Sequence, residues 1–260
     1  MFGAIAGRYD LLNTLLSFSA HKWWRRVALR RCALRPGMTA LDVGAGTADM
    51  ALGMAARVGP EGQVLGVDFC EPMLRVGARK VAARGLDGRV RLLAGDAQAL
   101  PLADGSVDAA VTAFVLRNVT DVPRTFREMA RVTRPGGMVV SLELSRPASP
   151  LLRRLYYLYF YRVLPRIGGM LSRKDAYTYL PNSLTDFHSP EELAEMMRAA
   201  GLEEVRALRL TGGIVAVHAG RVPGGSLPPT AEEPHGIEPG GAAAREGAGD
   251  DDLRGALGGA

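Results

Sequence analysis

Long apolar runs and cysteines are both scarce in this chain of 260 residues. No run approaches the roughly 20 apolar residues that a membrane-spanning helix needs. The N-terminus lacks the charged start, apolar centre and cleavage site of a signal peptide. The two cysteines, Cys32 and Cys70, are too few for a disulfide framework. These absences predict a cytoplasmic protein that is either soluble or peripheral to a membrane.

Metal-ligand spacing is absent as well, because the two cysteines and four histidines form no C-x-x-C or H-x-x-x-H pattern. We therefore expect no metal site. With 47% apolar residues, the chain is long enough to bury one sizeable core. A single folded domain, residues 1–221, is the expectation.

Acidic residues are sparse in residues 1–221, which hold 20 Asp and Glu against 30 Lys and Arg. This basic balance suits an anionic membrane surface or RNA, and it also suits simple solubility. Residues 222–260 differ, because Gly, Ala, Pro and acids dominate there and large apolar residues are rare. Such a segment cannot offset its ordering entropy, so we expect a disordered tail without a catalytic role.

Strand and helix patterns alternate along the middle of the chain. The expected strands are residues 38–43, 63–67, 90–93, 107–112 and 138–144, and the expected helices are 47–58, 72–84 and 122–134. This alternation predicts an α/β fold, a mostly parallel sheet with helices on both faces. Residues 203–210 and 214–218 predict a terminal antiparallel hairpin, and Ser189 with Glu192 predicts a capping box on the preceding helix.

Two helical segments lie outside this alternation. One is the N-terminal segment, residues 1–35, which is helical over 8–32, and the other is an insertion at residues 148–185. Open α/β sheets bind ligands at the carboxyl ends of their strands. Because insertions at these two places can cover that edge, we expect them to form a substrate lid.

The segment LDVGAGTAD, Leu41–Asp49, has the glycines of a nucleotide-binding turn but ends in a carboxylate. A dinucleotide fold would need glycine at position 49, so that a pyrophosphate could reach the helix N-terminus. Asp49 would repel phosphate and attract a ligand that is cationic at that end. S-adenosylmethionine (SAM) carries an ammonium and a sulfonium group. The first hypothesis is therefore a SAM-dependent methyltransferase with a Rossmann-like sheet of seven strands.

The same segment supplies the first cofactor-binding candidates. Gly44 and Gly46 let the backbone turn tightly and approach the ligand, and Thr47 can cap the next helix or donate to the ligand carboxylate. Asp49 is expected to accept from the ligand amino group, directly or through water. Asp42, in the same segment, is a further candidate.

Two more acidic residues follow the next predicted strands. Asp68 ends the second strand and is placed to bind both ribose hydroxyls, since a carboxylate accepts two hydrogen bonds. Asp96 follows the third strand and can accept from the adenine amino group, while the Ala97 amide faces a ring nitrogen. Each signal is weak alone, but their order and spacing together favour SAM.

Further segments complete a family pattern: Phe2–Arg26, Gly95–Asp108, LRNVTD from Leu116, RPGG from Arg134, VLPRIGG from Val163, YTYLPNS from Tyr177 and GGIVAVHAG from Gly212. With LDVGAGTAD they resemble the UbiE/MenG quinone-biosynthesis C-methyltransferases over nearly all of residues 2–220. The resemblance implies SAM-dependent methylation of a ring carbon, converting demethylmenaquinol to menaquinol and, in dual-function members, also methylating the ubiquinol precursor. It implies cofactor contacts at Thr47, Asp68, Asp96 and Ala97, and it places Ala113 where some members have serine.

A quinol becomes a carbon nucleophile when the hydroxyl beside the reacting carbon loses its proton, which an oxidised quinone cannot do. Stabilising the phenolate is then the main electrostatic task. Arg117 is the candidate to hold the oxyanion, Asn118 to orient a water or the hydroxyl, and Tyr9 to add a polar contact from the N-terminal lid. In the alternative interpretation Arg117 pairs with a carboxylate such as Asp121, and Tyr9 only packs.

A polyprenyl tail would place the substrate in a bilayer. Leu151–Gly169 combines four arginines with an aromatic cluster from Tyr156 to Tyr161, and Lys22–Arg26 is a smaller patch of the same kind. This composition is typical of an interfacial helix on an anionic membrane, here the inner face of the cytoplasmic membrane, and ordinary lid packing explains it equally well.

Other functional classes stay open. A methyltransferase acting on RNA or on another lipid-like small molecule would share the fold, although no recognition module for nucleic acid is visible and none is expected as a partner. Asp49 disfavours an NAD-linked oxidoreductase. A non-catalytic subunit with the same fold would not need intact cofactor groups. The sequence allows a homodimer without determining the oligomeric state.

Overall fold

The computed structural model describes residue 3 and residues 6–147, 149–159, 162 and 187–224. The chain divides into two units, Met1–Pro228 and Pro229–Ala260, and every described residue belongs to the first. The predicted tail therefore lies outside the described residues, except for residues 222–224. Of the predicted insertion at 148–185, only residues 149–159 and 162 are described.

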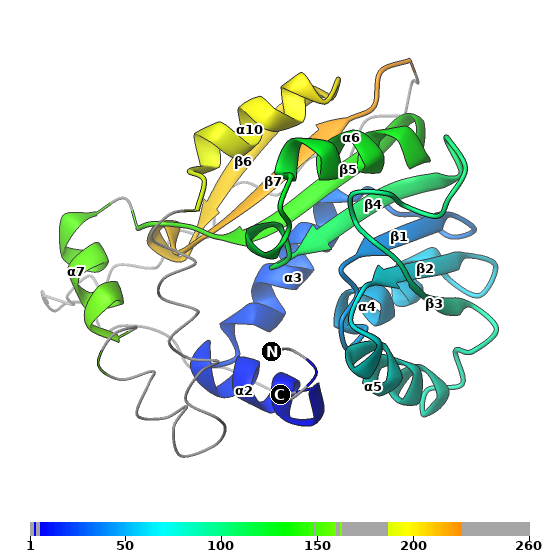
Figure 1. Ribbon diagram of the computed structural model, residues 1–260, viewed down its shortest axis with the longest axis horizontal. Coiled ribbons are helices and arrows are strands. Elements are labelled where there is room, and N and C mark those ends of the chain that lie inside the picture. The colour runs from blue at the N-terminus through cyan, green and yellow to red at the C-terminus, as the bar shows by residue number, and fades with distance from the viewer. Residues whose placement is uncertain (1–2, 4–5, 148, 160–161, 163–186, 225–260) are drawn as a thin grey trace, which may run out of the picture. The chain divides into compact units, whose positions relative to one another are not determined.

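Seven strands form one sheet in the order β3-β2-β1-β4-β5-β7-β6 (Figure 1). The strands are β1 Thr39–Val43, β2 Gln63–Asp68, β3 Val90–Ala94, β4 Val107–Ala113, β5 Thr133–Leu144, β6 Glu203–Leu210 and β7 Val215–Arg221. Strands β1 to β5 pair in parallel, and β7 runs antiparallel between β5 and β6. The predicted Rossmann-like sheet and its terminal hairpin are confirmed.

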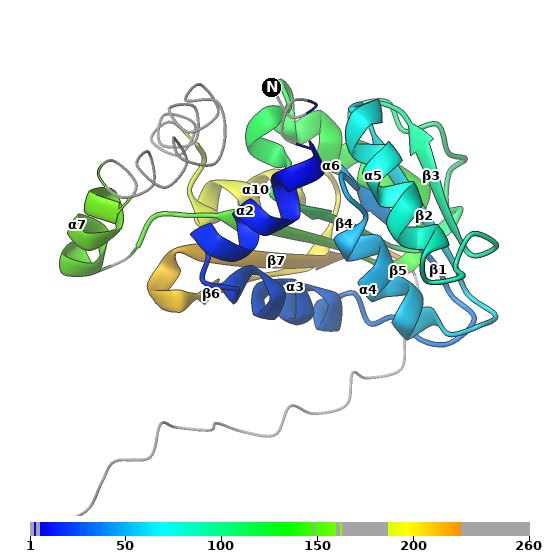
Figure 2. The same cartoon turned by 90° about the horizontal axis from the view of Figure 1, so that it is seen from below.

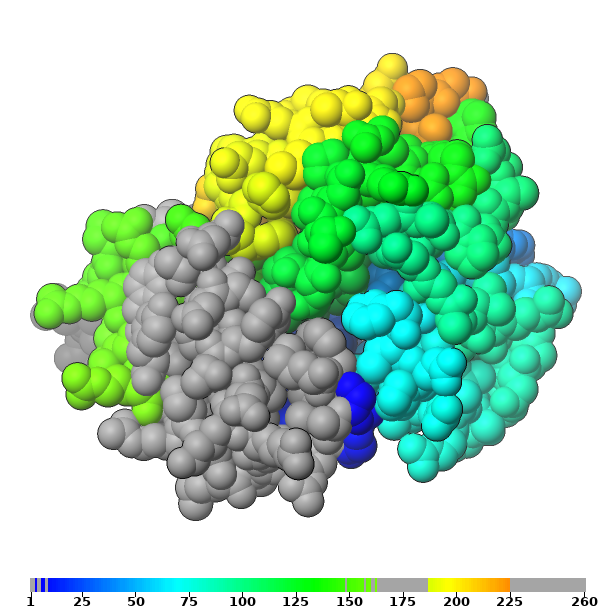
Figure 3. All heavy atoms as spheres, in the orientation of Figure 1, coloured from blue at the N-terminus to red at the C-terminus, as the bar shows by residue number. Residues whose placement is uncertain are grey.

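Helices cover both faces of this sheet (Figure 2). The helical elements are η1 Ala6–Arg8, α2 Tyr9–Leu16, α3 Ala20–Arg31, α4 Asp49–Val58, α5 Glu71–Ala82, η2 Leu116–Asn118, α6 Val122–Val132, α7 Pro150–Leu158, α10 Pro190–Ala199 and η4 Thr211–Gly213. Helices α3, α4 and α5 pack on one face, and α6 and α10 on the other. Figure 3 shows the side chains of α6 and α10, in green and yellow, as one continuous surface. None of the described helices is long and apolar enough to cross a bilayer.

The central strands are apolar on both sides because each side is covered. In β5, Val139 packs in the core beneath α6 and α10, whereas Val140 and Leu142 pack in the core beneath α3 and α4. All three side chains are completely buried. A strand buried on both faces is typical of a parallel sheet, and it explains why β1 to β5 lack strict alternation of apolar and polar residues.

The predicted N-terminal helix is broken into three pieces. Phe18 and Ser19 adopt left-handed backbone angles, with φ of 48° and 64°, and these angles end α2 and start α3 in a new direction. Just before the break, the hydroxyls of Thr14 and Ser17 donate to backbone carbonyls four residues earlier. Such bonds compete with regular helix geometry. The break leaves α3 free to pack Trp24 against the sheet.

Strand β5 begins at Thr133, five residues before its predicted start, so Pro135, Gly136 and Gly137 lie inside the strand rather than before it. An irregularity in the pairing with β4 accommodates them, because Val107 pairs with Thr133 but Ala109 already pairs with Met138. The capping box on α10 is confirmed: the Glu192 N–H donates to Ser189 Oγ, and the Ser189 N–H donates to the Glu192 carboxylate.

Candidate active site

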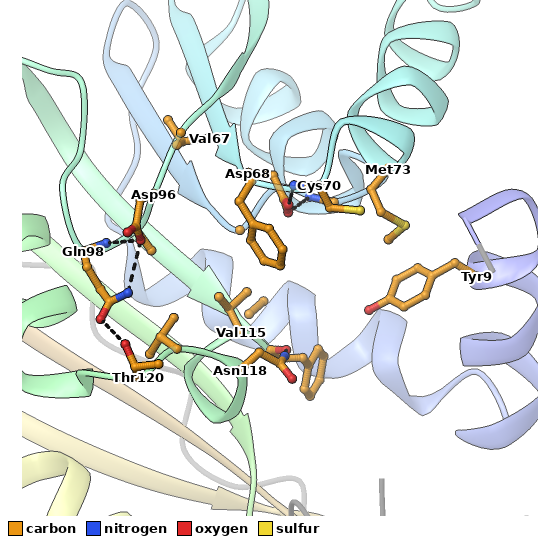
Figure 4. A pocket seen from close by; sticks show the side chains of 18 residues that line it. Tyr9, Val67, Asp68, Cys70, Met73, Asp96, Gln98, Val115, Asn118 and Thr120 are labelled. Atoms are coloured by element: carbon orange, nitrogen blue, oxygen red, sulfur yellow. Dashed lines mark hydrogen bonds between the residues drawn. The ribbon is translucent and has the colours of Figure 1, made fainter. Parts of the chain in front are cut away.

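A cavity of about 390 Å³ lies at the carboxyl ends of β1, β2, β3 and β4. It brings together eight of the predicted site residues: Tyr9, Gly44, Gly46, Asp68, Asp96, Ala97, Ala113 and Asn118. Figure 4 shows Tyr9 reaching in from α2 on the side opposite Asp96. Sequence reasoning missed several other lining residues, among them Phe69, Met73, Gln98, Phe114 and Thr120. Phe69 and Gln98 adjoin predicted residues, and this adjacency was the available signal.

The glycine turn after β1 forms one wall of this first cavity. Gly44 has a φ of +76°, and a Cβ at this position would lie 2.2 Å from Val115 Cγ2. Only glycine fits there, because both the backbone angle and the close contact exclude a side chain. The Gly44 and Ala45 N–H groups both donate to the Val67 carbonyl, at 2.7 and 3.1 Å, so the turn is held against the end of β2.

Asp68 ends β2 and is anchored by two backbone donors. The Gly46 N–H donates to Asp68 Oδ2 and the Cys70 N–H to Oδ1, both at 2.8 Å. Burial nevertheless raises the pKa of Asp68 above its usual value, even though both N–H groups oppose this shift. The structure thus holds a partly desolvated carboxylate in a fixed orientation on the wall of the first cavity. Such a group can accept two further hydrogen bonds from a vicinal diol.

Asp96 and Gln98 join the loops that follow β3 and β4. The backbone and side-chain amides of Gln98 donate to Asp96 Oδ1, at 2.8 and 3.3 Å. Gln98 Oε1 in turn accepts from the Thr120 hydroxyl at 2.8 Å and from the Asp121 N–H at 2.9 Å. These bonds tie together the two loops at this end of the first cavity (Figure 4).

Three predicted cofactor residues, Asp42, Thr47 and Asp49, do not line the first cavity. Asp42 lies in the core, where it accepts from the Ala51 N–H at 3.0 Å and where burial raises its pKa to about 7. Thr47 does not cap α4, because the N-cap residue is Ala48 and the Thr47 hydroxyl donates to Asp10 Oδ1 at 2.6 Å. The expectation that Thr47 caps the helix is therefore corrected.

Asp49 is engaged by two cations rather than open to a ligand. Arg25 Nη1 lies 2.5 Å from one carboxylate oxygen, and Lys80 Nζ donates to the other. Burial alone would raise the pKa of Asp49, but Arg25 and Lys80 hold it below its usual value. The carboxylate is thus neutralised by Arg25 of α3 and Lys80 of α5. Its contact with the ligand amino group, directly or through water, stays a prediction.

The same cations connect the N-terminal helix to the sheet. Lys80 Nζ also donates to Asp10 Oδ2 at 2.7 Å, and Asp10 accepts from Thr47 as well. Asp10 therefore anchors the start of α2 beside the glycine turn. Because Tyr9 is the residue immediately before Asp10, this anchor also fixes Tyr9 at the first cavity.

A second cavity, of about 380 Å³, adjoins the first. Its wall is mostly apolar and comes from α2, α3, α7 and the ends of β4, β5 and β6: Tyr9, Asn13, Leu16, Ser17, Phe18, Ala20, His21, Trp24, Arg25, Phe114, Arg117, Leu144, Leu152, Leu155, Tyr156, Tyr159, Thr211 and Ile214. Tyr9 and Phe114 line both cavities. The two cavities therefore meet at this pair of aromatic residues.

Arg117 lines the second cavity and Asn118 the first, although they are neighbours in η2. Arg117 pairs with Glu143 of β5, with Nη1 3.6 Å from Oε2, and not with Asp121, which caps α6 by accepting from the Arg124 N–H. Burial raises the pKa of Glu143, although Arg117 and backbone N–H groups oppose the shift. Sequence reasoning missed Glu143, because it stands inside an apolar strand with no motif around it.

The first cavity suits SAM, because a glycine-only turn, an anchored carboxylate and a second carboxylate from the β3 loop face one space. The chain matches the model of the ubiE/COQ5 methyltransferase family over residues 1–222. It is 45% identical over 221 residues to a demethylmenaquinone methyltransferase of Geobacillus kaustophilus, covering 85% of this chain and 94% of that protein.

Two other proteins extend this comparison. The chain is 41% identical over 221 residues to the ubiquinone/menaquinone biosynthesis C-methyltransferase UbiE of Idiomarina loihiensis, covering 85% of this chain and 88% of the relative. Among solved structures, a SAM-dependent methyltransferase from Aquifex aeolicus shares the fold, with a TM-score of 0.57 and 22% identity over 76% of this chain and 89% of that one.

Proposed function

The chain belongs to the ubiE/COQ5 methyltransferase family and is a SAM-dependent methyltransferase; on that premise we propose that it methylates a ring carbon of a polyprenylated quinol. The substrate is 2-demethylmenaquinol and the product menaquinol, in menaquinone biosynthesis, and the ubiquinol precursor is the second candidate substrate. The methyltransferase domain comprises residues 1–221, and residues 222–260 take no part in the reaction.

The observation that carries this proposal is the meeting of two chemically different cavities at Tyr9 and Phe114. The first has acidic side chains and a glycine turn, which suit a polar nucleoside. The second is lined mainly by apolar and aromatic side chains and is open to a ring with a hydrocarbon tail. A group transferred between the two ligands needs to cross only the junction between the cavities.

SAM, when bound, supplies an activated methyl group on a positively charged sulfur. In our proposal Asp68 binds the ribose hydroxyls, Asp96 and the Ala97 amide bind the adenine, and Gly44 and Gly46 let the backbone approach the amino acid end. Ala113 contributes only its small size at this wall. These residues would hold the cofactor in the first cavity, beside the junction with the second, and proximity of the two ligands would lower the barrier.

Arg117, Asn118 and Tyr9 act on the quinol. When the hydroxyl beside the reacting carbon ionises, its electrons increase the nucleophilicity of that carbon. The carbon would form its bond to the methyl group as the bond from methyl to sulfur breaks, which leaves a neutral thioether. The ring carbon then loses its proton and the phenolate oxygen takes one up, so that the methylated quinol is aromatic again and one proton is released overall. Arg117 stabilises the developing oxyanion from the second cavity. Tyr9, at the junction, and Asn118, from the first cavity, orient the hydroxyl or a bridging water. In this buried place a fixed cation stabilises the charge far more than water would.

A direct assay tests the proposed reaction. The purified chain is incubated anaerobically with SAM and either a short-chain demethylmenaquinol, its oxidised quinone or a pool of transfer RNA. We expect one added methyl group on the quinol and none on the quinone or the RNA, detected by mass spectrometry. Methylated RNA together with unchanged quinol would refute the proposal in favour of an RNA methyltransferase.

We also propose that the second cavity opens toward an anionic membrane surface, where a polyprenyl tail resides. Two exposed apolar side chains, Phe18 and Leu155, line this cavity. The helices α2 and α7, which contribute to its wall, carry four more: Leu11, Leu15, Leu151 and Leu158. Phe18 is the most exposed, at 80%. Arg153 and Arg154 on α7, with Lys22 and Arg26 on α3, are exposed among the same elements. This combination is typical of peripheral membrane binding, here at the cytoplasmic face.

Charge reversal on α7 is expected to weaken this binding. The variant Arg153→Glu/Arg154→Glu should lose about tenfold or more of its partitioning onto anionic vesicles, because each basic residue near such a surface contributes about 1 kcal/mol. Flotation with vesicles of defined anionic lipid content, at low and high salt, measures the change. The matched control is Arg127→Glu/Arg198→Glu, which reverses exposed charges on α6 and α10. Equal flotation of both variants would contradict the membrane proposal.

A further inference from the structure

His21 of α3 lies in the wall of the second cavity and is 5% exposed. Its Nδ1 atom is 2.7 Å from Ser17 Oγ, and Ser17 Oγ is 2.6 Å from the backbone carbonyl oxygen of Asn13. The carbonyl oxygen can only accept, so the single hydroxyl proton of Ser17 points to Asn13. Ser17 must then accept from His21, which places the imidazole proton on Nδ1.

The imidazole ring carries no second proton at neutral pH. Burial lowers the pKa of His21 to about 4, and the neighbouring Arg25 contributes to this lowering. In a neutral ring with its proton on Nδ1, the Nε2 atom has only a lone pair. Nε2 is therefore a hydrogen-bond acceptor that cannot donate.

This acceptor has no partner in the part of the chain that the structure describes. It is also not among the fully buried polar atoms that lack a partner, so Nε2 keeps some accessible surface, and the second cavity is the space that His21 lines. In a mostly apolar wall such an acceptor has few donors near it, and it gains a hydrogen bond when a donor reaches it. A ligand that brings a hydroxyl proton to this wall satisfies Nε2, and a ligand that offers only acceptors does not.

We propose that His21 Nε2 accepts a hydrogen bond from a ring hydroxyl of the substrate and thereby selects the reduced quinol over the oxidised quinone. This inference rests on the proposed function, because it deepens the assignment of the second cavity to the quinol. Arg117, in the same wall, offers only donors and can bind the oxygen of a hydroxyl, a phenolate or a carbonyl. His21 discriminates, because a quinone carbonyl would turn its lone pairs toward the lone pair of Nε2.

Two substitutions distinguish the effect of the Nε2 acceptor from that of the rest of the imidazole ring. His21→Asn places an amide near the position of Nδ1, which keeps the contact with Ser17 and removes the acceptor. His21→Gln instead places an amide oxygen near the position of Nε2. The dissociation constants of a short-chain demethylmenaquinol and of its oxidised quinone are measured anaerobically with S-adenosylhomocysteine present. SAM affinity and thermal stability report on folding, and His188→Asn serves as the matched control.

In the wild type we expect the quinol to bind at least tenfold more tightly than the quinone. His21→Asn should abolish this preference by weakening quinol binding at least tenfold, with quinone binding unchanged, and His21→Gln should restore part of it. Equal loss of both ligands, or an unchanged ratio in His21→Asn, would overturn the inference. The proposed function is judged separately: a wild type that methylates the quinol upholds it even when the two redox forms bind equally well.

Discussion

Replacing Arg117 with alanine is expected to lower kcat for a reduced quinol by about 100-fold to 1000-fold, the usual cost of removing a fixed oxyanion-stabilising group. The side chain of Arg117 is 9% exposed and borders the second cavity, so little water is present to replace it. The KM for SAM should change little, because Arg117 does not line the first cavity. Steady-state kinetics with a short-chain demethylmenaquinol measure both quantities.

The controls for Arg117 must separate chemistry from folding, because alanine leaves Glu143 buried without its cation. The double variant Arg117→Ala/Glu143→Gln removes both charges, so it should recover thermal stability while kcat stays low. Arg117→Lys keeps the charge but not the planar pair of donors. Its kcat should lie between those of the wild type and Arg117→Ala. Arg127→Ala, on the exposed side of α6, should match the wild type. A threefold loss of turnover corresponds to an increase in activation free energy of under about 1 kcal/mol. If Arg117→Ala loses no more than that, Arg117 has no role in the mechanism.

The second large effect is expected from Asp68→Ala, which should weaken SAM binding about 100-fold or more. A carboxylate that accepts two hydrogen bonds from ribose hydroxyls loses both, and hydrogen bonds to charged groups contribute roughly 1.5 to 3 kcal/mol each. The substitution also removes the acceptor for the Gly46 and Cys70 N–H groups, so the glycine turn loosens. Isothermal titration calorimetry with SAM measures the affinity directly.

Asp68→Asn refines this experiment, because the amide oxygen can still accept from the Cys70 N–H while the negative charge is gone. It should bind SAM more tightly than Asp68→Ala and less tightly than the wild type. Asp87→Ala removes an exposed carboxylate between α5 and β3 and is the matched control for net charge. SAM affinity that falls less than threefold in Asp68→Ala would assign the ribose contact to another group.

Residues that follow strands were predictable, and Asp68 and Asp96 show why. Asp68 is the last residue of β2 and Asp96 lies two residues beyond β3, and the carboxyl ends of parallel strands meet at one edge of the sheet. Recognising the strands therefore placed both carboxylates in one crevice.

Asp49 shows the limit of this reasoning. Its place at the start of α4 was readable, but the pairing with Arg25 and Lys80 depends on where two other helices pack.

The side chains of adjacent residues can also lie in different cavities, and a sequence motif does not predict this. Arg117 and Asn118 were predicted as one pair, yet the single turn η2 directs them to different cavities. Glu143 and His21 went unnoticed, because an isolated acid in an apolar strand and a lone histidine in a helix carry no local signal. Their significance comes from Arg117 and Ser17, the residues that the fold places beside them.

The sequence by itself determined the order of strands and helices, the glycine turn and the acids at the strand ends, because these follow from local periodicity and from residue spacing. Only the tertiary structure decided which charges neutralise one another, which polar atoms keep an open lone pair, and that two cavities meet at Tyr9 and Phe114. Such features depend on contacts between distant segments. Their energies arise from burial and from distances of a few ångströms, and linear spacing does not encode these distances.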